Sequence, residues 1–181
     1  MRSLVLKYGL RSGAVLGACM FATMPFHEQI GFKPIGMIIG YTSMLLAFLM
    51  IHAGMKNYRD TLGGGEVSYG RALTVGLLIM LIGCVIYVAC WEVLYYTAFP
   101  DFAEKYAEFA IAQAREAGKS PAEIAAIATQ MKAFGEQYKN PLINIAYTML
   151  EPLPVGLLYS FVSAWLVSRT RGPATARMAT A

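Results

Sequence analysis

The sequence predicts an all-α integral membrane protein with four transmembrane helices and, between the third and the fourth, an exported hairpin of two helices. Hydrophobic residues make up 57% of its 181 residues and charged residues only 14%, which is too few charges for an ordinary soluble domain. Between Arg71 and Glu92 the chain has twenty residues without a charge. A helix of about 20 apolar residues crosses about 30 Å of hydrocarbon. These observations favour one membrane domain over residues 1–181.

Four apolar segments set the positions of the transmembrane helices. They lie at about 10–26, 35–55, 72–97 and 141–168. The first is short, and Lys7 and Arg11 are expected to extend it by reaching the headgroups with their charged ends. The fourth contains Glu151 followed by Pro152 and Pro154. Because proline removes a backbone donor, we expect a kink near Glu151.

The distribution of lysine and arginine predicts the orientation of the helices. Basic residues cluster before the first helix, between the second and the third, and in the tail 169–181. With four crossings these three segments share one side of the membrane, which positive charge identifies as the cytoplasm. The connection 100–140 has five basic and six acidic residues, and its near-neutral balance permits export. Both termini are therefore predicted to be cytoplasmic.

The exported segment 100–140 is predicted to be a helical hairpin. Apolar residues recur at spacings of three and four in both halves, as on one face of a helix. They are Phe102, Tyr106 and Phe109, then Ile124, Ile127, Met131, Phe134 and Tyr138. Ser120, Pro121 and Glu123 form the N-cap, first-turn proline and capping-box glutamate of the second helix. The apolar faces are expected against each other, with the outer leaflet and a partner protein as open alternatives.

Other patterns point away from several function classes. The cysteines, Cys19, Cys84 and Cys90, lie inside apolar runs, which favours packing over disulfides or metal ligands. Val15–Cys19 resembles a lipobox, but the apolar stretch before it is short and apolar residues continue after it, so we favour an uncleaved first helix. The sequence lacks the glycine-lysine pattern of a phosphate loop. We expect no metal, no cofactor and no nucleic-acid partner.

Small residues recur every fourth position in three of the predicted helices. Such a spacing lets helix backbones approach closely within a membrane. The residues are Gly9, Gly13 and Gly17, then Gly36 and Gly40, then Gly156, Ser160 and Ala164. They are expected to pack helices within one chain, and homodimerisation through one stripe is the alternative.

Two carboxylates at membrane depth form the main candidate site. Glu151 lies eighteen residues from Arg169, or about 27 Å along a helix, and Glu92 lies twenty-one residues from Arg71, or about 31 Å. The two are thus at similar heights near the outer interface. Neighbouring side chains complete the candidate polar site: Tyr95, Tyr96, Asn144, Thr148, Tyr41 and His27. A proton, cation or ligand site is one interpretation, and a structural or interfacial role for each carboxylate is the other.

Several short motifs, in order, resemble one family. They are Lys7-Tyr8-Gly9-Leu10, Tyr58-Arg59-Asp60, Gly64-Gly65, Val67-Ser68-Tyr69-Gly70-Arg71-Ala72-Leu73, Pro100-Asp101-Phe102 and Pro154-Val155-Gly156-Leu157. Together they resemble a bacterial membrane family known as domain of unknown function 4199. The resemblance implies four helices in a bacterial inner membrane, which would make the exported hairpin periplasmic. It implies no activity and no catalytic residues.

Three hypotheses for function follow. The first is a non-enzymatic scaffold or accessory protein that contacts lipid and a partner or a second copy through the hairpin or a small-residue stripe. The second is a small proton- or ion-coupled carrier built around Glu92 and Glu151. The third, a membrane enzyme acting on lipid, is the weakest, because the sequence contains no recognisable nucleophile–base pair or metal set.

Overall fold

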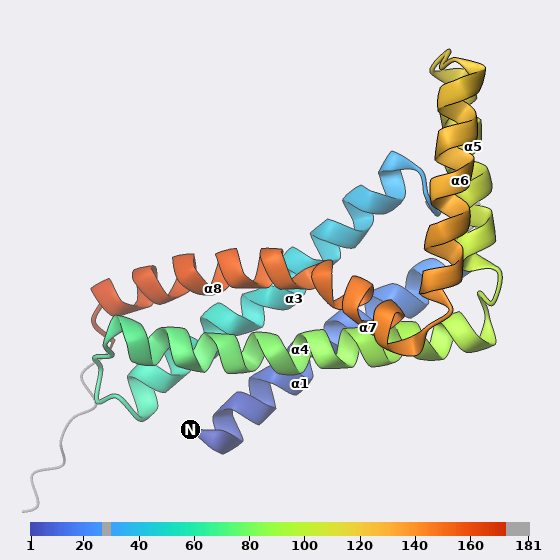
Figure 1. The fold of residues 1–181 in the computed structure, drawn as a ribbon. Helices are drawn as coiled ribbons and strands as arrows, with labels where there is room; N and C mark the ends of the chain where they lie inside the picture. Colours follow the sequence, from blue (N-terminus) through green and yellow to red (C-terminus); the bar gives the residue numbers. More distant parts are fainter. Residues whose placement is uncertain (27–29, 173–181) are drawn as a thin grey trace, which may run out of the picture.

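The computed structural model describes residues 1–26 and 30–172, and every regular element in these ranges is helical. In chain order the elements are α1 (Arg2–Thr23), the 3₁₀-helix η1 (Met24–Phe26), α3 (Pro34–Thr61), α4 (Tyr69–Thr97), α5 (Phe102–Glu116), α6 (Pro121–Tyr138), α7 (Pro141–Leu150) and α8 (Pro152–Arg169). Helices α1, α3, α4 and α8 lie along one bundle, and the hairpin of α5 and α6 projects from one end (Figure 1). His27 and the tail residues 173–181 lie outside the described residues.

Four segments are long and apolar enough to cross a membrane, as the sequence predicts. They are Arg2–Phe26, Pro34–Thr61, Tyr69–Thr97 and Pro141–Arg169. Helix α1 begins eight residues before the apolar stretch that marks it in the sequence. Lysine and arginine are good helix formers, so the helix continues through this charged stretch, where Val5 and Gly9 are buried.

The bundle has two chemically different ends. At one end, which we call the basic end, α1 and α4 begin and α3 and α8 end, so that the N-terminus and the C-terminal end of α8 lie together (Figure 1). At the other, which we call the hairpin end, α4 ends, α3 begins and the hairpin is attached. Helix α4 is central, because it packs against α1, α3 and α8 and also against α7.

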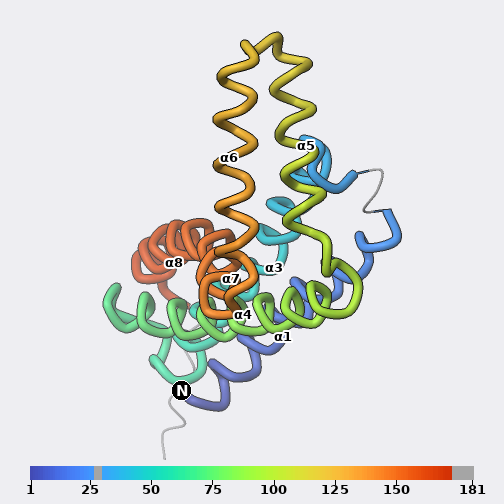
Figure 2. The backbone as a smooth tube through the Cα atoms, turned by 45° about the vertical axis from the view of Figure 1, so that its right-hand side comes forward, coloured from blue at the N-terminus to red at the C-terminus, as the bar shows by residue number. Residues whose placement is uncertain are grey.

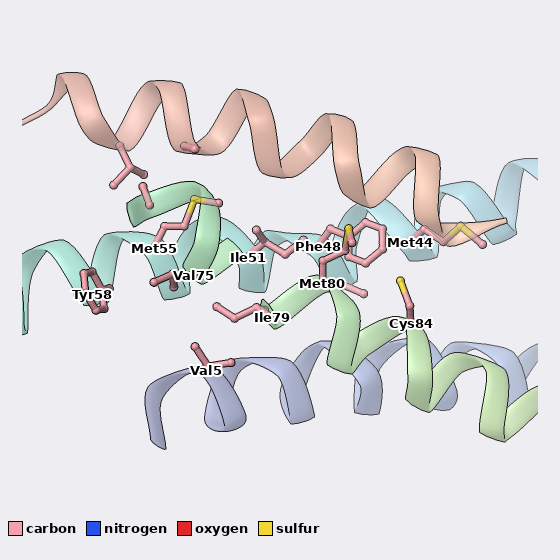
Figure 3. Packing of buried hydrophobic residues seen from close by; sticks show 14 of the residues in the cluster. Val5, Met44, Phe48, Ile51, Met55, Tyr58, Val75, Ile79, Met80 and Cys84 are labelled. Atoms are coloured by element: carbon pink, nitrogen blue, oxygen red, sulfur yellow. The ribbon is translucent and has the colours of Figure 1, made fainter. Parts of the chain in front are cut away.

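The core of the bundle lies between α3, α4 and α8 and is closed by α1 on the far side (Figure 3). Phe48, Ile51 and Met55 of α3 and Val75 and Ile79 of α4 are fully buried. Many other large apolar side chains of these helices are exposed, as expected of surfaces that face lipid. The close contact of the helices gives dispersion interactions that lipid does not provide between separated helices.

The last membrane-length segment, Pro141–Arg169, is divided at Glu151. Helix α7 ends at Leu150 and α8 begins at Pro152, with Glu151 at the junction. Pro152 cannot donate a backbone hydrogen bond, and the Glu151 amide donates to the Thr148 carbonyl only through a long bond of 3.4 Å. The kink predicted from the two prolines is therefore present.

Helices α5 and α6 pack against each other as an antiparallel pair. Ser120 and Glu123 form the predicted capping box, in which the Ser120 amide donates to the Glu123 carboxylate at 2.9 Å. Gly118, with a φ of 68°, makes the turn that connects the two helices. The hairpin extends crosswise to the long axis of the bundle (Figures 1 and 2).

A cluster of rings, the aromatic anchor, fixes the base of the hairpin to the bundle. Its members are Phe32, Trp91, Phe102, Tyr106, Phe134, Tyr138 and Tyr147. The ring centroids of Trp91 and Phe102 are 4.8 Å apart, and those of Phe32 and Phe102 are 5.3 Å apart. Such edge-to-face and tilted pairs are the arrangements that aromatic rings prefer. The apolar faces of the hairpin are thus directed at each other and, at its base, at the bundle.

Candidate functional site

Glu151 is held by a tyrosine of the central helix. The Tyr87 hydroxyl of α4 donates a hydrogen bond of 2.7 Å to Glu151 Oε2. The carboxylate lies at the kink between α7 and α8, where the two prolines interrupt the regular helix. A carboxylate within a membrane-length apolar segment is costly unless it has a partner, and Tyr87 is that partner. The bond joins α4 to the last segment at the junction of α7 and α8.

A second set of polar groups lies at the base of the hairpin. The Trp91 indole donates to the Tyr138 hydroxyl at 2.9 Å, and the Thr148 hydroxyl donates to Asn144 Oδ1 at 3.2 Å. The Thr148 hydroxyl is also a hydrogen-bonding neighbour of Tyr138. Burial is the main cause that raises the pKa of Tyr138 to about 12, so this phenol is neutral at ordinary pH. The set connects α4, α6 and α7.

Glu92 lies one to two turns beyond Tyr87 on α4 and is half-buried. Its Oε1 atom is buried and has no hydrogen-bond partner among the described residues. The same is true of Nδ2 of Asn144, a side chain with no exposed surface. Both Glu92 and Glu151 are close enough to Tyr138 that their charges raise its pKa. The two carboxylates therefore have a common neighbour, and their use as one site stays a prediction.

The other predicted members of the site are dispersed. Tyr95 is buried and stacks edge-on with Tyr138 at 5.5 Å between centroids, whereas Tyr96 is 57% exposed. Tyr41 on α3 is 48% exposed. The structure thus brings Tyr95, Asn144 and Thr148 toward Tyr138 and leaves Tyr96 on the surface.

A cavity of about 170 Å³ lies beside the Tyr87–Glu151 pair, between α1, the start of α3 and α4. Its wall is mainly apolar and includes the polar groups Cys19, Thr23, Ser43, Tyr87 and Trp91. Tyr87 has two roles, because it lines this cavity and donates to Glu151. A space of this size has room for several water molecules. No group of three or more metal-ligating side chains occurs in the described ranges.

The small residues of the three stripes have different surroundings. In α1, Gly9 and Gly13 abut Ile82 and Ile86 of α4, and Gly17 abuts Cys90. Gly156, Ser160 and Ala164 of α8 are buried, with Gly156 beside Met80 and Phe48. Gly36 lies against the backbone of residues 30–31, and Gly40 has nothing within 4 Å. The α1 and α8 stripes thus face neighbouring helices of the same chain, whereas Gly40 does not.

Sequence reasoning missed Tyr87, Trp91 and Tyr138. The residue counts contain a signal for Tyr87. Tyr87 lies sixteen residues from Arg71, or about 24 Å along the helix. This height is closer to the height of Glu151, about 27 Å, than the height of Glu92, about 31 Å, is. No comparable signal marks Tyr138, because its partners come from a different helix and are fixed by the orientation of the hairpin.

The geometry defines a class of protein: a bundle of four membrane-length apolar helices with a polar cluster at the hairpin end. The chain belongs to the DUF4199 family, described as a protein of unknown function, whose profile matches residues 7–169. Comparisons with curated proteins and with solved structures found no match. The family membership predicted from the short motifs is confirmed, and the function has to be argued from the structure.

Proposed function

We propose that this protein is a non-enzymatic scaffold or accessory subunit of a bacterial inner membrane, in which the α5–α6 hairpin contacts a partner protein. The proposal includes four membrane crossings, cytoplasmic termini and a periplasmic hairpin, as the basic residues predict. The observation that carries it is the attachment of the hairpin. The aromatic anchor holds the hairpin rigidly at its base, while its distal part packs only on itself within the described residues.

The chemistry of the hairpin favours a protein over lipid as its partner. The two helices pack against each other, and Ala114 is buried in their seam. With six acidic and five basic residues in 100–140, the net charge is −1, which does not attract anionic headgroups. A protein surface with charges of both signs is the complementary partner.

The direction of the hairpin narrows the choice of partner. The hairpin runs crosswise to the bundle (Figure 2), so in the proposed orientation it extends over the lipid beside the bundle. Helix α6 has 18 residues and is about 27 Å long. A partner that meets the distal hairpin therefore lies next to the bundle in the same membrane, so we infer another integral membrane protein.

Photo-crosslinking in intact cells tests this proposal. A photoreactive residue at Gln113, exposed near the tip, is expected to give one discrete protein adduct whose yield falls as salt is raised. The matched control is Leu158, which is 67% exposed on the lipid-facing side of α8 and should give lipid adducts. Lipid adducts alone at Gln113 would show that the hairpin contacts the outer leaflet and not a partner protein. No adduct at Gln113, together with unchanged growth and protein abundance after removal of 102–138, would refute the proposal.

A second candidate function, a small proton- or ion-coupled carrier, is favoured by a different observation. Glu92 Oε1 and Asn144 Nδ2 are buried without partners in the described part of the chain, and such atoms commonly hold water or an ion. In proteoliposomes, Glu92→Gln and Glu151→Gln should each abolish a proton flux, whereas Glu136→Gln on the exposed hairpin should preserve it. A wild-type protein that conducts no protons, or a double variant that conducts them normally, would exclude this function.

A further inference from the structure

A large polar cavity lies at the basic end, far from the polar cluster described above. Its volume is about 580 Å³, and it is bounded by the end of α3, the connection that follows, the start of α4 and the end of α8. Three arginines line it, together with one carboxylate and four hydroxyl groups. The arginines are Arg71, Arg169 and Arg171, the carboxylate is Glu66, and the hydroxyl groups are those of Tyr58, Ser68, Ser168 and Thr170.

The walls of this cavity are held by internal bonds. Arg59, which is only 4% exposed, donates from Nη1 to the Thr170 carbonyl at 3.0 Å and to Thr170 Oγ1 at 2.5 Å. The Gly172 amide donates to the Gly65 carbonyl at 2.8 Å. Gly65 has a φ of 92°, which only glycine adopts easily, so the connection can turn back toward α8. The residues that follow α8 are thus fixed beside the start of α4, and the arginine at position 171 is positioned with them.

The cavity has an excess of positive charge. Arg171 forms an ion pair with Glu66 at 3.0 Å. Arg71 and Arg169 form no ion pair with any carboxylate of residues 1–26 and 30–172. The planar guanidinium group binds phosphate through two parallel hydrogen bonds, which makes arginine the preferred side chain for this anion. Two such groups are available here.

The first turn of α4 adds backbone donors to the same cavity. Ser68 is the N-cap of α4 and lines the cavity, and its side chain makes no capping bond. The amides at the start of a helix have no acceptor within the helix and favour an anion. The donors from α4 therefore supplement the two arginines.

The depth of the cavity indicates where the phosphate comes from. The Arg169 guanidinium lies over the ring of Trp165, 4.3 Å from its centroid, and Trp165 is 47% exposed. Tryptophan on the lipid-facing side of a helix end typically lies at the level of the headgroups. Basic pockets between transmembrane helices at this level bind anionic headgroups. We propose that this cavity binds a phosphate group, and that the phosphate belongs to an anionic phospholipid.

Native mass spectrometry of the intact protein tests the site, with phosphatidylglycerol titrated into phosphatidylcholine nanodiscs as the probe. The Arg71→Gln, Arg169→Gln double variant should bind phosphatidylglycerol about a hundredfold more weakly, since each charged hydrogen-bonding partner is worth about tenfold or more. Ser68→Asp keeps a good N-cap and adds a negative charge, so it should lose binding while remaining folded. The matched control is Lys56→Gln, which removes an exposed charge of α3 near the same end but outside the cavity.

Two results would overturn the inference. If both cavity variants retain phosphatidylglycerol as the Lys56→Gln control does, the cavity is not a phosphate site. The second result concerns inorganic phosphate in phosphatidylcholine nanodiscs. If it binds the wild type, if this binding requires Arg71 and Arg169, and if phosphatidylglycerol does not compete with it, the site binds a soluble phosphate and its assignment to lipid is wrong. Competition by phosphatidylglycerol supports the lipid source. The test is independent of the hairpin and of its partner.

Discussion

Replacing Arg59 by glutamine should release the C-terminal end of α8 from the bundle. The guanidinium group is almost completely buried and makes two bonds to Thr170, while its bond of 2.7 Å to Asp60 involves a partner that is 21% exposed. Each bond to a buried charged group contributes about 1.5–3 kcal/mol. The Asp60 bond is discounted for its exposure, and the structure is expected to relax after the change. The free energy that holds the end of α8 on the bundle should therefore fall by about 3 kcal/mol. The glutamine amide is too short to restore the bonds.

Hydrogen–deuterium exchange measures this loss where it occurs. A local loss of about 3 kcal/mol makes the amides of residues 166–172 exchange about a hundredfold faster. Arg59→Lys keeps the charge but not the fork of donors, so its exchange should be intermediate. The matched control, Arg115→Gln on the exposed face of α5, should leave these amides unchanged. Exchange in Arg59→Gln that equals the wild-type rate would show that Thr170 is held by something else.

Three further predictions concern other parts of the molecule. Gly13→Leu should destabilise the protein by about 1–3 kcal/mol, because Gly13 abuts α4, whereas Gly40→Leu should be neutral; equal midpoints of thermal unfolding in detergent would contradict this. Hydrogen bonds from the capping serine hold the pKa of Glu123 below its usual value. The capping box should therefore be intact above the ordinary glutamate pKa of about 4.3 and open only as the pH falls through the lowered pKa, and an NMR titration of Glu123 with an ordinary midpoint would refute it. Tyr87→Phe should leave Glu151 without its donor, at a cost of about 1 kcal/mol, and shift the carboxyl infrared band that Glu151→Gln abolishes; an unchanged band would disprove the pairing.

The fold could be predicted from the sequence because its signals are local. The uncharged run after Arg71 predicts α4, and Ser120 with Glu123 predicts the start of α6. The kink at Glu151 followed from the two prolines alone. Each of these signals lies within one continuous stretch of the chain, so no contact between distant residues is needed to recognise it.

The candidate site could be predicted only in part. Height along a helix is readable from residue counts, so the sequence could predict that Glu92 and Glu151 lie at similar heights, and their use as one site stays a prediction. Which side chain faces which depends on the rotation and contact of neighbouring helices, and these are set by close packing such as that of α1 on α4. The pairing of Tyr87 with Glu151 and the contact of Trp91 with Tyr138 across the hairpin are long-range results of that packing.

The segment of α7 and α8 makes stabilising contacts with earlier parts of the chain at both of its ends, so the order of synthesis determines when these contacts can form. At the hairpin end Tyr147 completes the aromatic anchor, and at the basic end Thr170 receives the bonds of Arg59. Both residues leave the ribosome after α1, α3, α4 and the hairpin have been made. Until then the buried arginine lacks its acceptor and the hairpin lacks one of its supports. Packing of α7 and α8 onto the bundle is therefore the step that satisfies both, and a chain truncated before Pro141 would expose both defects to cellular quality control.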